Sequence, residues 1–298
     1  MIRDLMNRHA IEAAQALCML LMSDPQFEQA TPDEVAKIEN NLGCCLLQMG
    51  RLNEAEQRFQ RAQKLVPDES KYLANYLAVR SNTSPSDPDL LRQVDKLLES
   101  GPSSQLEVTK AQIIAALSGP QEAMIWISAC ISRTPKSFDL YFIAAMIAMR
   151  LPDYYAASEF AEAGLSANPS DPDLCRAKAD ALMLQHMREN SGIMLPPIPL
   201  SEKQRTDIQQ SVVWYTKSVT IFSTPKDQRK FQLSEVLTQR GVAHMVLGEM
   251  ESALSDFNES INNNPGDSTA RFNRFTIRIR LEQSENIDSE AEYLLQIS

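Results

Sequence analysis

Two lysine–asparagine pairs recur near the N-terminus at a fixed interval. Lys37 and Asn41 lie four residues apart, and Lys71 and Asn75 repeat the pair with the same separation further along the chain. An asparagine amide both donates and accepts hydrogen bonds, so a row of such side chains can pair with the backbone of a bound peptide. Side chains of these types at this spacing could serve noncovalent peptide binding. The alternative interpretation is a solvated polar face that holds no ligand.

The same two places recur further along the chain with other residues. Gln239 and Asn273 occupy the asparagine place near the C-terminus, and Asp139 and Asp173 occupy the lysine place in the middle. A surface that is basic at one end and acidic in the middle would orient a bound peptide. The predicted peptide-binding residues are therefore Lys37, Asn41, Lys71, Asn75, Gln239 and Asn273.

The residue types that perform catalysis are sparse and scattered. The three histidines, His9, His186 and His244, are far apart in the chain, and no grouping with cysteine or aspartate has the spacing of metal ligands. Glycine-rich phosphate-binding loops are absent as well. The sequence therefore predicts no enzyme, no metal site and no cofactor.

Two other groups have a functional and a structural interpretation. Cys44 and Cys45 could form a redox or metal pair, but adjacent helical residues point about 100° apart, which favours two small buried positions. Asp171, Asp173 and Asp180 could form an acidic cluster. The first two flank Pro172 at a predicted helix start, where carboxylates cap the helix, so the structural interpretation is preferred.

The elements that would position the lysine–asparagine pairs are read from the stretch Asn41–Pro67. Apolar and small residues recur there at steps of three and four, which predicts two helices that each bury one face. Gly50 suits the turn between them because glycine readily adopts positive φ, and Pro67 ends the second helix. The buried positions are Gly43, Leu46, Ala55, Phe59 and Ala62.

The same spacing recurs, which is the test of a repeat. It reappears after twice the interval that separates the lysine–asparagine pairs, again after one more such interval, and once more near the C-terminus. The first two recurrences comprise Ala111, Ile114, Ala123, Ile127, Cys130 and Pro135, then Ala145, Ala148, Ala157, Ala161, Gly164 and Pro169. The last comprises Gly241, His244, Gly248, Ala253, Phe257, Ser260 and Pro265.

This pattern resembles the tetratricopeptide repeat, a helix-turn-helix unit with a period of about 34 residues. The resemblance implies an all-α, right-handed α-solenoid of stacked helix-turn-helix repeats, here about six to seven including degenerate and partial ones. It also implies a concave groove, lined by the first helices of successive repeats, that holds peptides or helices. The lysine–asparagine pairs fall on that groove.

The repeat register divides the chain. Residues 1–35 are expected to hold one helix over 2–24, either a capping helix or the second helix of a partial repeat, followed by a loop. A repeat array follows at 36–171, then a repeat with a proline-rich insertion at 172–233, and finally a repeat plus a truncated terminal repeat at 234–298. Within the array, the predicted repeats are 36–69, a degenerate 70–103, 104–137 and 138–171.

The proline-rich stretch Ser191–Leu200 cannot be helical because it contains Pro196, Pro197 and Pro199. It is interpreted as a rigid connector, with a ligand for a proline-recognition module or a flap over the groove as the alternative. The chain ends at Ser298 inside a predicted partner helix. An uncovered apolar face there would allow self-association.

Composition limits the partners. The chain of 298 residues carries a net charge of −10 with pI near 4.9, which argues against nucleic acid as the main partner. No apolar run is long enough for a membrane span, and no signal peptide is expected. Five cysteines without a Cys-x-x-Cys motif fit a reducing compartment, so a cytoplasmic location is expected.

The function expected from the sequence is a noncatalytic scaffold or adaptor that binds a protein or peptide segment. Two alternatives stay open. One is a regulatory domain of a larger enzyme or sensor, and the other is a dedicated chaperone of a secretion-type system.

Overall fold

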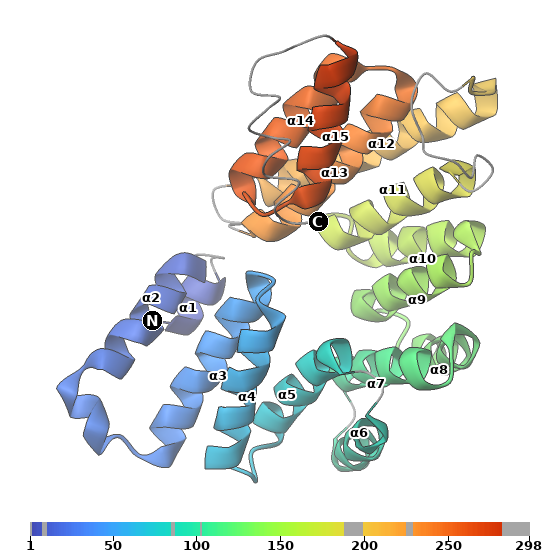
Figure 1. The fold of residues 1–298 in the computed structure, drawn as a ribbon. Coiled ribbons are helices and arrows are strands. Elements are labelled where there is room, and N and C mark those ends of the chain that lie inside the picture. Colours follow the sequence, from blue (N-terminus) through green and yellow to red (C-terminus); the bar gives the residue numbers. More distant parts are fainter. Residues whose placement is uncertain are drawn as a thin grey trace. The chain divides into compact units, whose positions relative to one another are not determined.

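The computed structural model describes residues 2–7, 11–84, 87–101, 103–187, 199–224 and 229–281. These residues form α-helices joined by short turns, with one 3-10 helix and no strand among them (Figure 1). The elements are α1 (Ile2–Asn7), α2 (Ile11–Ser23), η1 (Pro25–Gln29), α3 (Pro32–Gln48), α4 (Leu52–Leu65), α5 (Ser70–Thr83), α6 (Pro88–Ser100), α7 (Ser104–Leu117), α8 (Pro120–Arg133), α9 (Phe138–Arg150), α10 (Tyr154–Ala167), α11 (Pro172–Met187), α12 (Glu202–Phe222), α13 (Lys230–Leu247), α14 (Met250–Asn263) and α15 (Ser268–Arg280).

The helices belong to two compact units. The N-terminal unit comprises Met1–Asp153, Ser166–Asn168 and Pro225–Arg229, and the C-terminal unit comprises Tyr154–Leu165, Pro169–Thr224 and Lys230–Ser298. The division falls inside the predicted repeat 138–171, because α9 lies in the first unit and most of α10 (Tyr154–Leu165) in the second.

Local sequence determines where the helices begin and end. Thr31 caps α3 in a capping box with Glu34, and Ser201 caps α12 in the same way with Gln204. Pro32 occupies the first turn of α3, where its missing N–H costs nothing. Three turns that follow first helices depend on glycines with positive φ, a backbone conformation that glycine adopts without strain. These are Gly50, Gly119 and Gly248.

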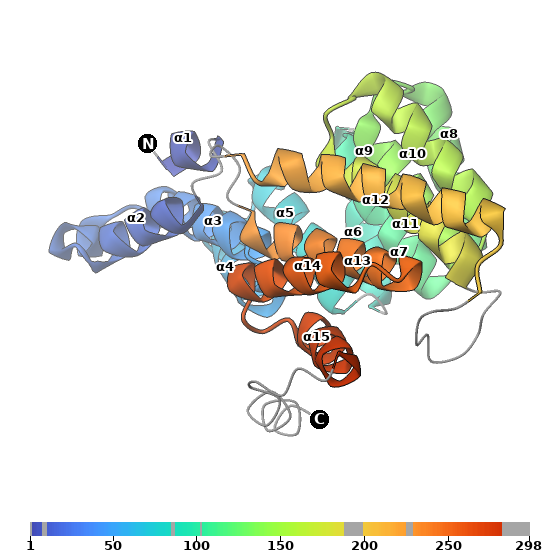
Figure 2. The ribbon, with the colours of Figure 1, turned by 90° about the horizontal axis from the view of Figure 1, so that it is seen from above.

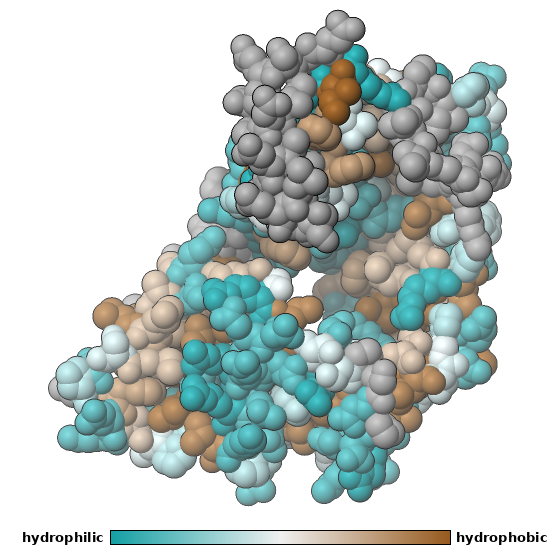
Figure 3. Space-filling view, viewed as in Figure 1, coloured by the Kyte–Doolittle hydropathy of each residue, from teal (hydrophilic) through white to brown (hydrophobic). Residues whose placement is uncertain are grey.

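In the N-terminal unit, helices pair along the chain and the first members of the pairs form a row. α3 packs against α4, and α7 packs against α8; α5 also contacts α7, and α7 contacts α9. α3 and α4 lie side by side in Figure 1. Figure 3 shows hydrophilic residues gathered over α4, whereas α2 presents more apolar surface. Because these first helices contact one another, α3, α5, α7 and α9 form a row that presents one face.

Small residues bring the paired helices close. Phe59 of α4 is 1% exposed and lies against Gly43 of α3, where an added Cβ would come within 2.8 Å of the ring. Phe257 of α14 repeats the contact with Gly241 of α13 at 2.7 Å. Glycine at these two places is therefore a consequence of packing.

The buried positions predicted from the repeat spacing of the second helices are confirmed. On α8, α10 and α14 the corresponding side chains are buried, and so are those of α4. They are Ala55, Phe59 and Ala62; Ala123, Ile127 and Cys130; Ala157, Ala161 and Gly164; and Ala253, Phe257 and Ser260.

The C-terminal unit repeats this arrangement around longer helices. α11 packs against α12, α12 against α13, and α13 against α14, and Figure 2 shows α13 and α14 running side by side. Tyr215 and Phe222 of α12 fill its core at 1% exposure each. The Ser218 hydroxyl donates to the carbonyl of Pro172 at 2.8 Å and ties α12 to the start of α11.

The N-terminal residues differ from the expectation of one helix over 2–24. They form two helices, and α1 packs against α2 around Ile11, Ala14 and Cys18. If α2 were the second helix of a partial repeat, the repeat spacing would bury Ala13 and Leu20, but both are exposed. The buried stripe of α2 instead comprises Ile11, Ala14 and Cys18. The expected loop Ser23–Thr31 contains η1.

Two other expectations concern residues that the structure does not describe. Residues 191–198 of the proline-rich stretch and the helix expected after residue 281 lie outside the described part of the chain.

Replacing Ala123 with leucine should destabilise the N-terminal unit by about 1–3 kcal/mol. Ala123 is fully buried at the start of α8, so three further carbons would force neighbouring side chains out of their rotamers. Urea unfolding provides the measurement, and Gln121→Leu, at an exposed position of the same helix, is the matched control. Equal stability of the two variants would show that the close packing at Ala123 is not as described.

Candidate functional site

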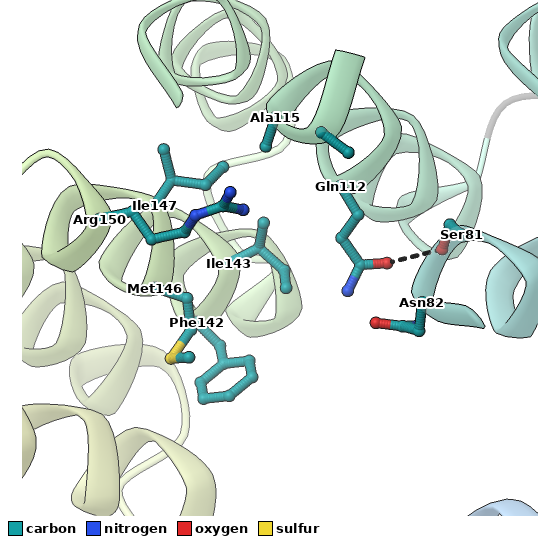
Figure 4. A pocket seen from close by; sticks show the side chains of 10 residues that line it. Ser81, Asn82, Gln112, Ala115, Phe142, Ile143, Met146, Ile147 and Arg150 are labelled. Carbon is teal, nitrogen blue, oxygen red and sulfur yellow. Dashed lines mark hydrogen bonds between the residues drawn. The ribbon is translucent and has the colours of Figure 1, made fainter. Parts of the chain in front are cut away.

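A cavity of about 370 Å³ opens on the row of first helices in the N-terminal unit. α5, α7 and α9 each contribute residues from their C-terminal halves, and Figure 4 shows how most of these side chains lie. We call this cavity the α5–α7–α9 groove. Its lining residues are Ser81, Asn82, Gln112, Ala115, Ala116, Phe142, Ile143, Met146, Ile147 and Arg150.

Helical spacing brings these residues onto one face of each helix. On α9, Phe142, Met146 and Arg150 follow one another at steps of four, which places them along one stripe. The repeat period then aligns the stripes of neighbouring helices, since Asn82, Ala116 and Arg150 hold the same place in successive repeats. The groove is thus a product of the repeat, formed by the last turn of α5, the second half of α7 and the stretch of α9 from Phe142 to Arg150.

The apolar side of the groove comes from α9. Ile143 and Ile147 are buried, while Met146 is 41% exposed and Phe142 is half-buried. Opposite them, α7 contributes the small Ala115 and Ala116. Large side chains that face small ones across a gap leave room for a ligand side chain.

The polar side of the groove comes from α5 and α7. The Asn82 Nδ2 donates to the carbonyl of Ala78 at 2.9 Å, and Gln112 Oε1 accepts a long bond from the Ser81 hydroxyl at 3.4 Å. Among the described residues, the Asn82 carbonyl oxygen and the Gln112 Nε2 have no partner. These two amides face Phe142 and Met146 across the groove (Figure 4), so a carbonyl oxygen that can accept and an amide nitrogen that can donate remain for a ligand.

Among the described residues that line the groove, Arg150 is the one cation. It is exposed in the last turn of α9, and its guanidinium extends into the space between α9 and α7 (Figure 4). Within the described part of the chain it has no ion-pair partner, and no carboxylate lines the groove. Its surroundings therefore favour neutral or anionic ligand groups.

The predicted residue Asn75 is half-buried, and its amide joins three first helices. Its Nδ2 donates to Asn40 Oδ1 on α3 at 2.7 Å, and its Oδ1 accepts from Gln105 Nε2 on α7 at 3.3 Å. Asn40 is 2% exposed, so the bond to Asn75 satisfies a buried amide. Alanine at Asn75 would remove this bond from the buried amide of Asn40. Lys71, one turn earlier on α5, is exposed as expected.

Lys37 and Asn41 line a second hollow of about 590 Å³ at the N-terminal end of the row. Lys37 is exposed and pairs with Asp33, while Asn41 is half-buried. Apolar walls come from α1, α2, η1 and α3, with Asp24 and Glu34 at the edge. We call this the N-terminal hollow. It places two predicted site residues together, beside mixed charges.

Gln239 and Asn273 lie in the C-terminal unit on α13 and α15, which contact each other. Both side chains are half-buried.

Several buried polar groups belong to the packing of the C-terminal unit. Asp180 accepts from Tyr215 at 2.6 Å, and burial raises the pKa of both groups. Asp171 caps α11 by accepting from the N–H of Leu174 at 2.8 Å, as the structural interpretation predicted. His244 is half-buried and bonds to Glu249 at 2.6 Å. In the described residues, no group of three histidines, cysteines or carboxylates is placed to hold a metal ion.

The cysteines are free thiols, and burial suppresses the ionisation of Cys44, Cys130 and Cys175. Desolvation raises the pKa of Cys44 to about 11, and it raises the pKa of Cys130 and Cys175 to about 11 as well. Cys45 is fully buried, and its bond to Cys18 of α2 raises its pKa further. These pKa values do not favour a reactive thiolate pair at Cys44 and Cys45.

Alkylation should therefore be slow in the folded protein. At pH 8, a pKa near 11 instead of 9 leaves about a hundredfold less thiolate on Cys44, and its alkylation by iodoacetamide should slow by a similar factor relative to the urea-unfolded chain. Peptide mass spectrometry over time measures the rate at each cysteine. Rapid alkylation of Cys44 in the native protein would contradict the assignment.

Comparison with known proteins gives a consistent result. The tetratricopeptide repeat family model matches residues 36–69, which is the first repeat identified from the sequence. A search of curated proteins gave no match. No helix in the described ranges is long and apolar enough to cross a bilayer.

Solved structures are similar in fold at low sequence identity. A monomeric mutant of IFIT1 solved with m7Gppp-AAAA superposes with a TM-score of 0.69 at 14% identity, over 97% of this chain and 64% of that one. Cut9 from the APC/C hetero-tetramer Cut9-Hcn1 superposes with a TM-score of 0.56 at 12% identity, over 96% and 56%. The chain spans less than two thirds of the length of either protein. Both are built from tetratricopeptide repeats, so the likeness shows the fold.

Proposed function

Because this chain is a tetratricopeptide repeat protein, we propose that it is a scaffold that binds an extended segment of a partner protein in the α5–α7–α9 groove. The observation that carries the proposal is a cavity on the first-helix face with an apolar wall and two amides whose hydrogen-bonding capacity is unfilled. These are the features by which protein pockets orient a ligand.

The dimensions suit an extended chain. Packed helices lie roughly 8–10 Å apart, which equals about three residues of extended peptide at ~3.3 Å each. A segment that crosses α5, α7 and α9 would therefore place about six to nine residues on this face. The Asn82 carbonyl and the Gln112 Nε2 would pair with its backbone, which supplies one donor and one acceptor per residue.

The charge of the groove favours protein over nucleic acid as the ligand. Strand binding needs several cations that track the phosphates, together with exposed aromatic platforms. Of the described lining residues, Arg150 is the one cation and Phe142 is the one aromatic. An apolar side chain on a peptide fits Met146 and Phe142 better.

The residues predicted from the sequence take a secondary place in this proposal. Lys71 is on α5, eleven residues before Asn82, which places it on the same helical stripe and makes it a flanking contact for a longer segment. Lys37 and Asn41 would extend the site into the N-terminal hollow. Gln239 and Asn273 stay candidate contacts of the C-terminal unit.

The test is a selection of random peptides of about twelve residues, long enough to cross the groove, displayed on phage against the full chain. Selected peptides are then labelled with fluorescein, and their affinity is measured by anisotropy. Met146→Glu places a charge on the apolar wall and should weaken binding by about thirtyfold or more.

The matched control is Ile125→Glu, which makes the same change on the second helix α8, where Ile125 is 73% exposed. It should change the affinity by less than about twofold. Thermal melts verify that both variants are folded. Peptides that bind Met146→Glu as tightly as the unmodified protein would exclude this groove as the binding site.

A further inference from the structure

Resting on the proposed function, we propose that the bound segment carries a bulky apolar side chain and an acidic side chain two residues apart. The apolar side chain would lie against Met146 and Phe142, and the carboxylate would pair with Arg150. The inference concerns the chemistry of the ligand, which the presence of a groove does not by itself determine.

The apolar anchor follows from the volume and lining of the groove. Met146 is 41% exposed although its neighbours Ile143 and Ile147 are buried, and Ala115 leaves space opposite. A flexible thioether next to such a gap accommodates apolar groups of varied shape. A single large aliphatic or aromatic side chain would cover this surface and remove it from water.

The acidic partner follows from the charges around Arg150. In a chain with a net charge of −10, this groove contains one cation and no carboxylate among its described lining residues. The Arg150 guanidinium offers a planar fork of donors that matches a carboxylate in two-pronged geometry. It meets no carboxylate elsewhere in the described residues, so a ligand carboxylate would displace no existing pair.

The spacing follows from helix and strand geometry. Met146 and Arg150 are one turn apart on α9, which is about 6 Å along the helix axis at 1.5 Å per residue. In an extended peptide, residues i and i+2 point to the same side and lie about 6.6 Å apart. Where the segment has crossed α5 and α7 and runs along the axis of α9, an apolar residue and an acidic residue at i and i+2 therefore match the two contacts in register.

An acidic side chain fits the arrangement better than a terminal carboxylate. The amides of Asn82 and Gln112 lie on the other side of the groove and would hold backbone on either side of the anchor. A chain that terminated at Arg150 would be held by one cation alone, without the nest of backbone donors that captures a terminus.

The experiment repeats the phage selection on the unmodified protein and on Arg150→Glu. The unmodified protein should enrich peptides in which Asp or Glu lies two residues from a large apolar residue. For such peptides, Arg150→Glu should weaken binding by about tenfold or more, because it replaces attraction by repulsion. Changing the peptide acid to lysine should restore binding to Arg150→Glu and weaken binding to the unmodified protein.

The matched control is Lys64→Glu, the same reversal of an exposed cation in the last turn of a helix, here α4. It should leave the affinity within about twofold. If the selected peptides do not bind the Met146→Glu variant but carry no acidic residue at that spacing, this inference is overturned and the proposed function stays intact. A selection whose peptides are indifferent to Met146→Glu would overturn both.

Discussion

Replacing Phe59 with alanine is expected to destabilise the N-terminal unit by about 3–5 kcal/mol. The ring is 1% exposed and fills the space that Gly43 leaves on α3, so truncation creates a cavity that rigid neighbouring helices cannot close. The two tryptophans make the measurement specific, because Trp126 lies on α8 in the N-terminal unit and Trp214 on α12 in the C-terminal unit. Urea unfolding of single-tryptophan variants reports each unit separately.

The control substitution is Phe257→Ala, which removes the corresponding ring next to Gly241 in the C-terminal unit. It should lower the free energy of unfolding that Trp214 reports by a similar amount. Phe138→Ala, at a position that is 37% exposed, should cost clearly less. A Phe59→Ala protein with an unchanged Trp126 transition would show that the ring does not hold α3 and α4 together.

Replacing Arg240 with methionine is expected to cost about 3–5 kcal/mol in the C-terminal unit. The guanidinium donates to both oxygens of Asp256 at 2.6 and 2.9 Å, and Asp256 is 4% exposed. Removing the arginine leaves a carboxylate in the core without its main partner, and His244, 3.9 Å away, cannot replace two short bonds. Urea unfolding followed by Trp214 measures the loss.

The double variant distinguishes the cost of losing the ion pair from the cost of leaving Asp256 as an unpaired buried charge. Arg240→Met with Asp256→Leu removes both charges and should be more stable than Arg240→Met alone. Arg51→Met is the control for an exposed pair, since Arg51 and Glu54 are both about half exposed, and it should cost at most about 1 kcal/mol. A double variant no more stable than Arg240→Met would mean that the buried carboxylate is not the cause.

The fold was predictable from the sequence because the small residues that permit close helix packing recur at regular intervals. Gly43, Ala55 and Ala62 recur at intervals that permit close helix packing, and the structure buries them. The pairing of α1 with α2 was not predictable in this way. The apolar residues of α2 fit two registers that differ by one position, and only the packing of Ile2 and its neighbours on Ile11 selects one.

The sequence was sufficient to predict that the candidate site lies on the face formed by the first helices. It was not sufficient to predict where on that face the site lies. Lys37, Asn41, Lys71 and Asn75 lie on α3 and α5, whereas the groove is lined by the end of α5 together with α7 and α9. The missed signal is the series Asn82, Ala116 and Arg150, whose members are separated by the same interval as the two lysine–asparagine pairs. This series is hard to recognise in the sequence because its three positions hold different residue types.

Sequence alone also could not show that the amide of Asn75 is occupied. Its partners Asn40 and Gln105 are 35 and 30 residues away, and only the folded row of helices brings them within hydrogen-bond distance. An amide that joins α3, α5 and α7 stabilises the face on which a ligand would lie. In the α5–α7–α9 groove, the free hydrogen-bonding capacity lies on Asn82 and Gln112 instead.

Site-specific photo-crosslinking tests the groove most directly. Benzoylphenylalanine is introduced at Ala116, an exposed residue that lines the α5–α7–α9 groove, and separately at Ile125 on α8. Each protein is irradiated with a fluorescein-labelled peptide from the selection. We expect a crosslink from position 116 that unlabelled peptide competes away, and none from position 125. Crosslinking from position 125 without crosslinking from position 116 would contradict binding in this groove.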